Sequence, residues 1–398
     1  MNENIISHFN EYCCIFRLVN SAINNITVDI SDLKFDWKYV FRLSDYLSFT
    51  ALVKRGIDLL CDDQMPPAEL KKMFDDEFKR QIIIDSNQLY ELKLLTDTFE
   101  EAGIDMLLLK GAYMKNMYPS TVYRYMGDID TYIDYANVDN ANTVLINLGY
   151  KIHDSNADEK IYIKEPFICL EEHFNLSDSE FKLINDYYKT ILKKSTLKDD
   201  YSHIYEMTLE DIYIYLSVHA VHHYYYAGIA PRIFLDYYVF LEKYKDILNM
   251  NYIENVLKSF GYYEFNKKAV ELAYKWFGKN GTGLDKNSNM DLFIASCSTY
   301  GTDEHNVGIR ATKMTAEGES PSKIRFLMKQ LFPKYSEIKE KFPILKNLPL
   351  LLPVIWLRYV ISKMGNQRTV KYYKSINSDT ADFYKKIESE FGLNNKKN

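Results

Sequence analysis

The sequence feature that most constrains the fold is the stretch over residues 104–134, IDMLLLKGAYMKNMYPSTVYRYMGDIDTYID. Its apolar run over residues 106–109 is typical of a strand that is buried on both faces. A Lys-Gly pair, a helical pattern over residues 112–117 and a basic loop follow, and Gly-Asp-Ile-Asp then opens a second apolar run. This order predicts a strand, a short helix and a second strand that carries two acidic side chains.

The second strand carries Asp128 and Asp130 at its start. Because side chains alternate between the two faces of a strand, both carboxylates project from one face, roughly 7 Å apart at about 3.3 Å per residue. Two divalent cations about 4 Å apart can clamp the attacking and leaving oxygens of a phosphoryl transfer. Mg²⁺ suits this chemistry because it binds one or two carboxylates together with substrate phosphates and water. The spacing therefore predicts a site for Mg²⁺ or Mn²⁺.

Groups that favour phosphate precede the acidic pair. Lys110 and Arg124 supply positive charge. Gly111 lets backbone N–H groups approach a phosphate, and the start of the following helix favours negative charge. Taken singly, each motif also fits a solvated carboxylate pair or an ordinary turn. Their combination in this order favours a site for a phosphate-bearing substrate.

The order of these motifs resembles that of a little-characterised bacterial nucleotidyltransferase family in the DNA polymerase β-like nucleotidyltransferase superfamily. The superfamily typically has a Gly-Gly or Gly-Ser turn, then Asp-x-Asp or Asp-x-Glu, then a third carboxylate on a later strand. In this family the turn is usually Lys-Gly, as at Lys110 and Gly111. The resemblance is best over residues 104–174. It implies Mg²⁺-dependent transfer of a nucleotidyl group from an NTP to an acceptor that the superfamily does not specify.

A third carboxylate is expected in the strand predicted over residues 167–174, FICLEEHF. Alternation places Glu171 and His173 on one face, and Glu172 with apolar residues on the other. The resemblance implies an acidic residue two positions before a histidine, which Glu171 and His173 match. Because Glu172 stands where an apolar residue is usual, the choice between Glu171 and Glu172 stays open, and exposed edge-strand glutamates are the structural alternative. The third carboxylate would complete the metal site or act as a general base.

A helix predicted over residues 208–226 carries histidines. His219 and His223 are spaced i,i+4 and share one face. They could hold zinc with Asp236 as a third ligand, but the sequence has no His-Glu-x-x-His signature. The alternative is a pair of buried histidines bonded to Asp236 or to the backbone. The resembling family has a histidine-bearing helix followed by an Arg…Asp helix, which implies a nucleotide pocket lined by His219, His223, Arg232 and Asp236.

We therefore expect an α+β protein, with a small mixed sheet of nucleotidyltransferase type and extensive helical segments on both sides of it in the sequence. The chain of 398 residues is long enough for more than one core. The predicted regions are an N-terminal helical region (1–103), an α/β core (104–178), a helical domain (179–310) and a basic helical C-terminal region (311–398). Within the first region, a periodic charged pattern predicts one long helix from residue 68 to Gly103.

Charge is unevenly distributed along the chain. The net charge is −6, but the part from Arg310 onward holds 18 Lys and Arg against 8 Asp and Glu, a balance of +10 that leaves −16 before it. A long nucleic acid is therefore not expected as a partner of the catalytic part. The basic part contains an apolar run over residues 348–357 that is too short to span a bilayer. This run predicts either a buried helix pair or a peripheral membrane contact.

The compartment follows from the cysteines and the N-terminus. The five cysteines form neither a metal-ligand pattern nor a disulfide framework, and residues 2–10 lack the basic start of a signal peptide. Both observations favour the cytoplasm, with contact at the inner membrane face through the C-terminal region.

The predicted function is metal-dependent transfer of an NMP from an NTP. Asp128, Asp130 and Glu171 would hold the metal ions, and Lys110, Gly111, Arg124 and His173 would bind the substrates. The acceptor stays open between a sugar phosphate, another small molecule, a protein and an RNA end. Two other classes also fit: a catalytically silent nucleotide-binding regulator, and an interaction protein at the membrane surface in polysaccharide assembly.

Overall fold

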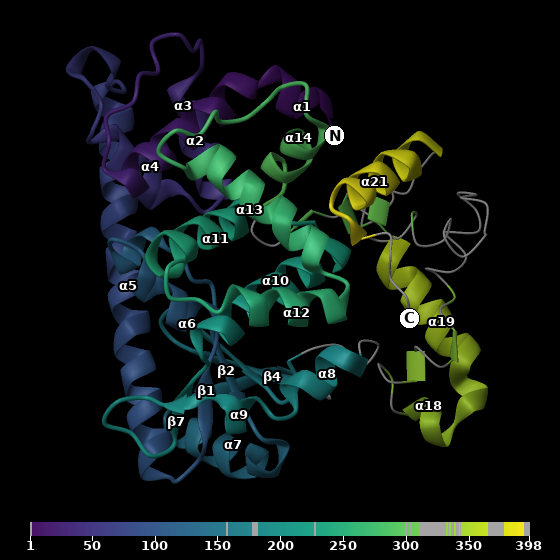
Figure 1. Cartoon of the computed structure of the whole chain (residues 1–398). Helices are drawn as coiled ribbons and strands as arrows, with labels where there is room; N and C mark the ends of the chain where they lie inside the picture. The colour runs from purple at the N-terminus through teal and green to yellow at the C-terminus, as the bar shows by residue number, and fades with distance from the viewer. Residues whose placement is uncertain are drawn as a thin grey trace.

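The fold is organised around one mixed sheet with helices on both of its faces (Figure 1). The computed structural model describes residues 2–156, 158–176, 182–226, 228–298, 344–364 and 378–393, with shorter pieces between 301 and 342. In this part of the chain the sheet has seven strands in the order β3-β4-β5-β2-β1-β7-β6. The predicted α+β fold with a mixed sheet is confirmed.

The strands are β1 (Met106–Leu108), β2 (Ile129–Ile133), β3 (Lys151–Ser155), β4 (Glu159–Lys164), β5 (Ile168–His173), β6 (Thr196–Leu197) and β7 (Ile204–Glu206). Strand β2 pairs antiparallel with β1 and parallel with β5, and β1 pairs parallel with β7. Strands β6 and β7 lie within the region predicted as a helical domain (179–310), and they extend the sheet beyond the predicted α/β core (104–178). Strands of two and three residues are too short for a periodic pattern, so their pairing with β1 decides their conformation.

Helices precede and follow the sheet. Before it come α1 (Asn2–Ser7), α2 (Phe9–Asn24), α3 (Trp37–Tyr46), α4 (Thr50–Ile57) and α5 (Ala68–Glu101). Around and after it come α6 (Lys110–Met114), α7 (Val138–Asn147), α8 (Lys182–Tyr188), α9 (Ile191–Lys194), α10 (Leu209–Tyr226), α11 (Pro231–Tyr244), α12 (Met250–Phe260), α13 (Tyr263–Phe277), α14 (Asn289–Ala295), α18 (Ile344–Asn347), α19 (Leu352–Met364) and α21 (Ser378–Glu390). None of the described helices is both long and apolar enough to cross a membrane.

Helix α5 joins the N-terminal helices to the sheet. Its 34 residues span about 50 Å at 1.5 Å per residue, and it runs along one side of the molecule (Figure 1). Phe74 belongs to the core of the helical part, whereas Leu95 and Phe99 belong to the core beneath the sheet. The predicted long helix is confirmed, and it contributes to both cores.

The central strands β1 and β2 are buried on both faces, as the apolar run of the first strand predicts. In β1, Met106 and Leu108 pack with α5 and α7, while Leu107 packs in the larger core that also contains α10 and α11. In β2, Ile129 and Ile133 occupy the smaller core. Because side chains alternate along a strand, Asp130 points to the opposite face from Ile129 and Ile133, toward the helical layer that contains α10.

Glu172 lies in the smaller core, on the face that alternation assigned to apolar residues. It is 0% exposed, and among the described residues neither of its carboxyl oxygens has a hydrogen-bond partner. Burial raises the pKa of Glu172 to about 8. Glu172 is thus a protonated core residue at neutral pH, and it faces away from Asp130.

We expect Glu172 to make stability depend on pH. The unfolded carboxyl ionises near pH 4.5, whereas the folded one stays protonated to about pH 8, so the free energy of unfolding falls as the pH rises through this window. Since each unit of pKa difference is worth about 1.4 kcal/mol, the loss reaches a few kcal/mol. Urea denaturation at pH 5 and pH 9 should show a smaller loss in Glu172→Gln than in the wild type. The exposed Glu101→Gln is the control, and equal losses in all three proteins would contradict the assignment.

Candidate active site

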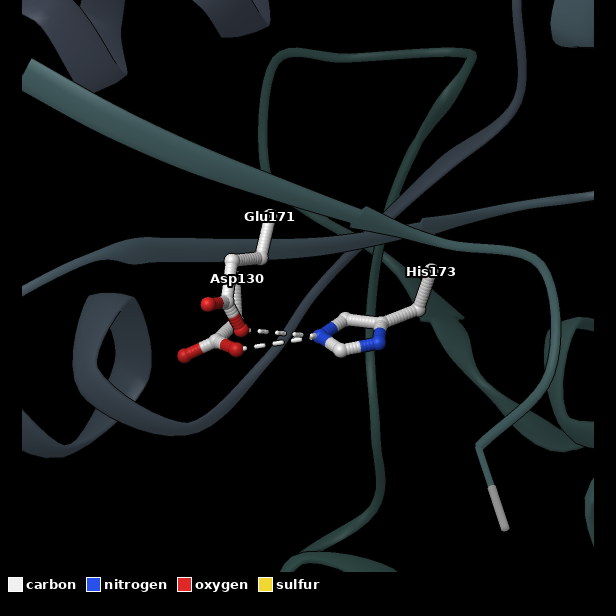
Figure 2. A group of neighbouring side chains, drawn as sticks. All are labelled: Asp130, Glu171 and His173. Carbon is white, nitrogen blue, oxygen red and sulfur yellow. Dashed lines mark hydrogen bonds and ion pairs between the residues drawn. The ribbon is translucent and has the colours of Figure 1, made fainter. Parts of the chain in front are cut away.

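Two carboxylates and a histidine converge from neighbouring strands. Asp130 on β2 lies opposite Glu171 on β5 in the parallel register, and His173 follows two residues later on the same face. Figure 2 shows the three side chains pointing toward one another. Each offers one ligand atom within 4.8 Å of the others. Asp128, immediately before β2, lies beside them in the same cavity.

Asp130 is the neutralised member of the cluster. Its Oδ1 accepts a hydrogen bond from Lys110 Nζ at 2.8 Å and lies 3.1 Å from His173 Nε2. On its other side, His173 Nδ1 lies 3.2 Å from Glu159 Oε2. Burial alone would raise the pKa of Asp130, but Lys110 and His173 hold it well below its usual value. Burial would lower the pKa of His173, but its bonds to Asp130 and Glu159 raise it.

The other two carboxylates lack such compensation. Among the described residues, none donates a hydrogen bond to Asp128 or forms an ion pair with it, and burial together with the charge of Asp130 raises its pKa. His173 Nε2 is 3.9 Å from Glu171. Burial and the charges of Asp128 and Asp130 raise the pKa of Glu171 to about 7. This excess of negative charge on oxygen ligands fits a divalent cation such as Mg²⁺.

A cavity of about 370 Å³ opens over the carboxylates and contains every residue that the sequence predicted for the site. These residues are Lys110, Gly111, Arg124, Asp128, Asp130, Glu171, His173, His219, His223, Arg232 and Asp236. The fold thus brings the predicted residues together from β2, β5, α6, α10, α11 and the loop before β2. Their chemical roles stay predictions.

The Lys-Gly turn is tight. Lys110 has a φ of 35°, a left-handed value that is costly for a residue with a side chain. A Cβ on Gly111 would lie 2.8 Å from the Met126 side chain and 3.2 Å from an Arg124 nitrogen. Packing against the loop before β2 therefore favours glycine at position 111, in addition to the phosphate approach that the sequence suggested.

The two arginines of the cavity differ in their partners. Arg124 binds Asp236 through Nε at 3.2 Å and a terminal nitrogen at 2.9 Å, and Tyr118 donates to the same carboxylate at 2.7 Å. Arg232 instead donates to the Tyr125 carbonyl at 2.6 Å, and none of the described carboxylates lies within 4 Å of it. The charge of Arg232 is therefore the more available to an anionic ligand.

His219 and His223 form a neutral pair. Their Nε2 atoms are 2.9 Å apart, so one ring donates and the other accepts. Burial and His223 lower the pKa of His219, and burial and Lys110 lower that of His223 to about 3. Of the alternatives considered for these histidines, a bond to Asp236 is not formed, because they bind each other and Asp236 binds Arg124 and Tyr118. In the described part of the chain, zinc would thus lack Asp236 as its third ligand.

Among the titratable residues that line the cavity, sequence reasoning missed Glu159, Tyr215 and His222. Glu159 lies opposite His173 in the antiparallel register of β4 and β5, which alternation along one strand does not reveal. Tyr215 and His222 lie one helical turn from His219, so the 3.6-residue period of α10 would have identified them.

Comparison with known proteins agrees with this geometry. No curated protein and no solved structure matches the chain significantly. A family model described as "Uncharacterised nucleotidyltransferase" matches residues 34–278, more than half of the chain, and this match includes every predicted site residue. The chain therefore belongs to the uncharacterised nucleotidyltransferase family.

Proposed function

We propose that the cavity transfers an NMP from an NTP to a hydroxyl-bearing acceptor, with Asp128, Asp130 and Glu171 as ligands of Mg²⁺ or Mn²⁺. The observation that carries the proposal is the register of β2 and β5. It sets Asp130 beside Glu171, with Asp128 adjacent and without an ion pair or hydrogen bond of its own among the described residues. Bound metal would supply positive charge to the phosphates and to the entering oxygen.

The chain's own cations would hold the triphosphate. Arg232 lines the cavity without a carboxylate of its own in the described structure, and Lys110 lies between Gly111 and Asp130. A phosphate between them would meet a guanidinium, an ammonium and the backbone at Gly111. Arg124 is bound to Asp236, so it would mainly position this side of the cavity. Its N–H groups that do not bind Asp236 could donate to the phosphates.

In the proposed reaction the acceptor oxygen forms a bond to the α-phosphorus, and the bond from that phosphorus to the bridging oxygen breaks. Pyrophosphate leaves with the electron pair of the broken bond. The hydroxyl proton passes to a base, for which Glu171 is suited when it is ionised, because its pKa of about 7 lies near neutral pH. His173 and Glu159 orient Asp130 and Glu171 from the side.

Incubation of the protein with each NTP labelled at the α-phosphate, Mg²⁺ or Mn²⁺ and a cell lysate tests this function. We expect label on a product with the wild type and a loss of at least about a thousandfold in Asp128→Asn/Asp130→Asn, because metal charge contributes several kcal/mol. Asp134→Asn, an exposed aspartate just after β2, is the matched control. Full activity in a folded double variant would remove these carboxylates from the site. Binding of Mg²⁺–NTP with no transfer to any product would favour the catalytically silent regulator.

Metal affinity should rise with pH. Glu171 must lose its proton to bind a cation, and its pKa of about 7 leaves it mostly protonated at pH 6. His173, whose pKa is also raised, acts in the same direction. Calorimetric titration with Mn²⁺ should therefore give an affinity about tenfold weaker at pH 6 than at pH 8. In Glu171→Gln the affinity should be lower and its pH dependence smaller. Equal affinities of the wild type at both pH values would exclude Glu171 as a ligand.

The C-terminal part also supports a peripheral contact with an anionic membrane. Leu350, Val354, Leu357 and Ile361 recur at helical spacing at and along α19, and they are between 61% and 92% exposed. Arg358 is exposed on the same helix, in a part of the chain that carries excess positive charge. An apolar face beside basic residues suits the interface of an anionic membrane. The buried helix pair considered from the sequence does not fit this exposure.

Vesicle flotation tests the membrane contact. With vesicles containing phosphatidylglycerol, Val354→Ser/Leu357→Ser should reduce binding at least about tenfold, since each apolar side chain contributes more than 1 kcal/mol. The matched control is Ile83→Ser/Ile247→Ser, at two comparably exposed positions outside α19. Equal flotation of both variants and the wild type, or no flotation of any of them, would refute the contact.

A further inference from the structure

A second chamber adjoins the catalytic cavity. It has a volume of about 270 Å³ and shares a wall with the catalytic cavity, formed by Lys110, Glu159, His173, Tyr215, His219 and His222. The arginines Arg124 and Arg232, as well as Asp128 and Glu171, line the catalytic cavity and do not line the chamber. The two spaces therefore meet beside His173, which contacts Asp130 and Glu159. They differ in the residues that line the rest of each space.

One wall of the chamber is aromatic. Tyr215, Tyr225 and Tyr226 come from α10, and Tyr262 comes from the turn between α12 and α13. The Tyr226 ring stacks on His222 with centroids 4.3 Å apart and 26° between the ring planes. Aromatic rings offer large, rigid apolar surfaces with polar edges. Such a wall suits a ring ligand that has an apolar face and polar substituents at its rim.

Another part of the chamber lining is polar and acidic. Asn156, Asp158 and Glu159 lie at the turn into β4, and Asn175 lies just after β5. Asn156 Oδ1 accepts the backbone N–H groups of Asp158 at 2.8 Å and Glu159 at 3.0 Å, which orders the turn. Asn175 Nδ2 lies 3.3 Å from Asp158 Oδ1. Amides and carboxylates so arranged can bind hydroxyl and amino groups.

The two spaces differ in their cations, because Arg124 and Arg232 line the catalytic cavity and do not line the chamber. Among the described residues that line the chamber, Lys110 is the only Lys or Arg, and it is bound to Asp130. Burial and the neighbouring His223 lower the pKa of His219, which is therefore neutral. Asp158 and Glu159 thus give the chamber a negative wall. A phosphate group would be repelled there, whereas the arginines of the catalytic cavity would attract it.

In-line displacement requires the entering oxygen and the leaving pyrophosphate on opposite sides of the α-phosphorus. With the triphosphate beside the arginines, the acceptor must approach from elsewhere. The chamber, which neither arginine lines, adjoins the catalytic cavity across the residues that the two spaces share. We propose that the chamber is the acceptor site and that it takes a small polyhydroxylated ring of sugar type, neutral or bearing an amino group and carrying no phosphate. This inference rests on the proposed nucleotidyl transfer.

Ligand-detected NMR with the full chain can test the class of ligand. The probes are glucosamine, glucose and glucose 6-phosphate near neutral pH, each with Mg²⁺ and α,β-methylene ATP and without them. We expect glucosamine to bind about threefold more tightly than glucose, the size of one exposed charge contact, and glucose 6-phosphate not to bind. The saturation-transfer signal of glucosamine, which reports its binding, should persist when the nucleotide analogue is added. Binding of glucose 6-phosphate equal to or tighter than that of glucose, or no sugar binding at all, would overturn the proposal.

Loss of the glucosamine signal on addition of the analogue would also overturn it, since the chamber would then hold the nucleobase. Asp158→Asn should abolish the preference for glucosamine over glucose, whereas Asp154→Asn, an exposed aspartate of the same hairpin outside the chamber, should keep it. Tyr226→Ala should weaken both sugars, with the exposed Tyr90→Ala as control. The affinity of the analogue itself is measured in parallel. Analogue binding without sugar binding would refute the acceptor class alone, and absence of analogue binding would refute the proposed function.

Discussion

The parallel pairing of β2 with β5 brings like charges together, and the rest of the site depends on this pairing. It sets Asp130 beside Glu171, and the residue before the strand adds Asp128. Carboxylates this close in a partly buried place repel one another, which raises the pKa values of Asp128 and Glu171. Lys110 and His173 make their short contacts with Asp130 and neutralise chiefly this carboxylate. The remaining negative charge is what makes this edge of the sheet suited to a cation.

The helical layer completes the site and holds its loop in place. Two contacts connect the loop before β2 to α11: Arg124 binds Asp236, and Arg232 binds the carbonyl of Tyr125. The same loop packs against Gly111, where a side chain would collide with Met126 and Arg124. The position of the loop that leads to Asp128 therefore depends on contacts with α6 and α11 as well as on the strand β2. A buried ion pair with two hydrogen bonds suits this positioning role, because one missing partner would leave the other charge buried.

The arginines are unevenly distributed in the space above the carboxylates. Arginines line the side toward α11, and tyrosines and acidic residues line the side toward the β3–β4 turn. A reaction that separates an anionic leaving group from an acceptor benefits from such a division, because each wall attracts one reactant and repels the other. The pair His219–His223 adjoins both spaces through His219 and is neutral. A positive charge on it would reduce the difference in charge between the two spaces.

The sequence by itself determined the elements and residue types of the site. The alternation of β5 separated Glu171 and Glu172 onto opposite faces but left open which of them joins Asp130, and the periodic pattern of α5 predicted one long helix. These patterns are local, because side-chain direction repeats every 2 or 3.6 residues. Only the tertiary structure decided which strands pair and in which register, and hence that Glu159 meets His173 and that β7 joins β1. It also decided that Asp236 binds Arg124 and leaves Arg232 available. Such choices depend on contacts between residues far apart in the chain, whose energies no local pattern encodes.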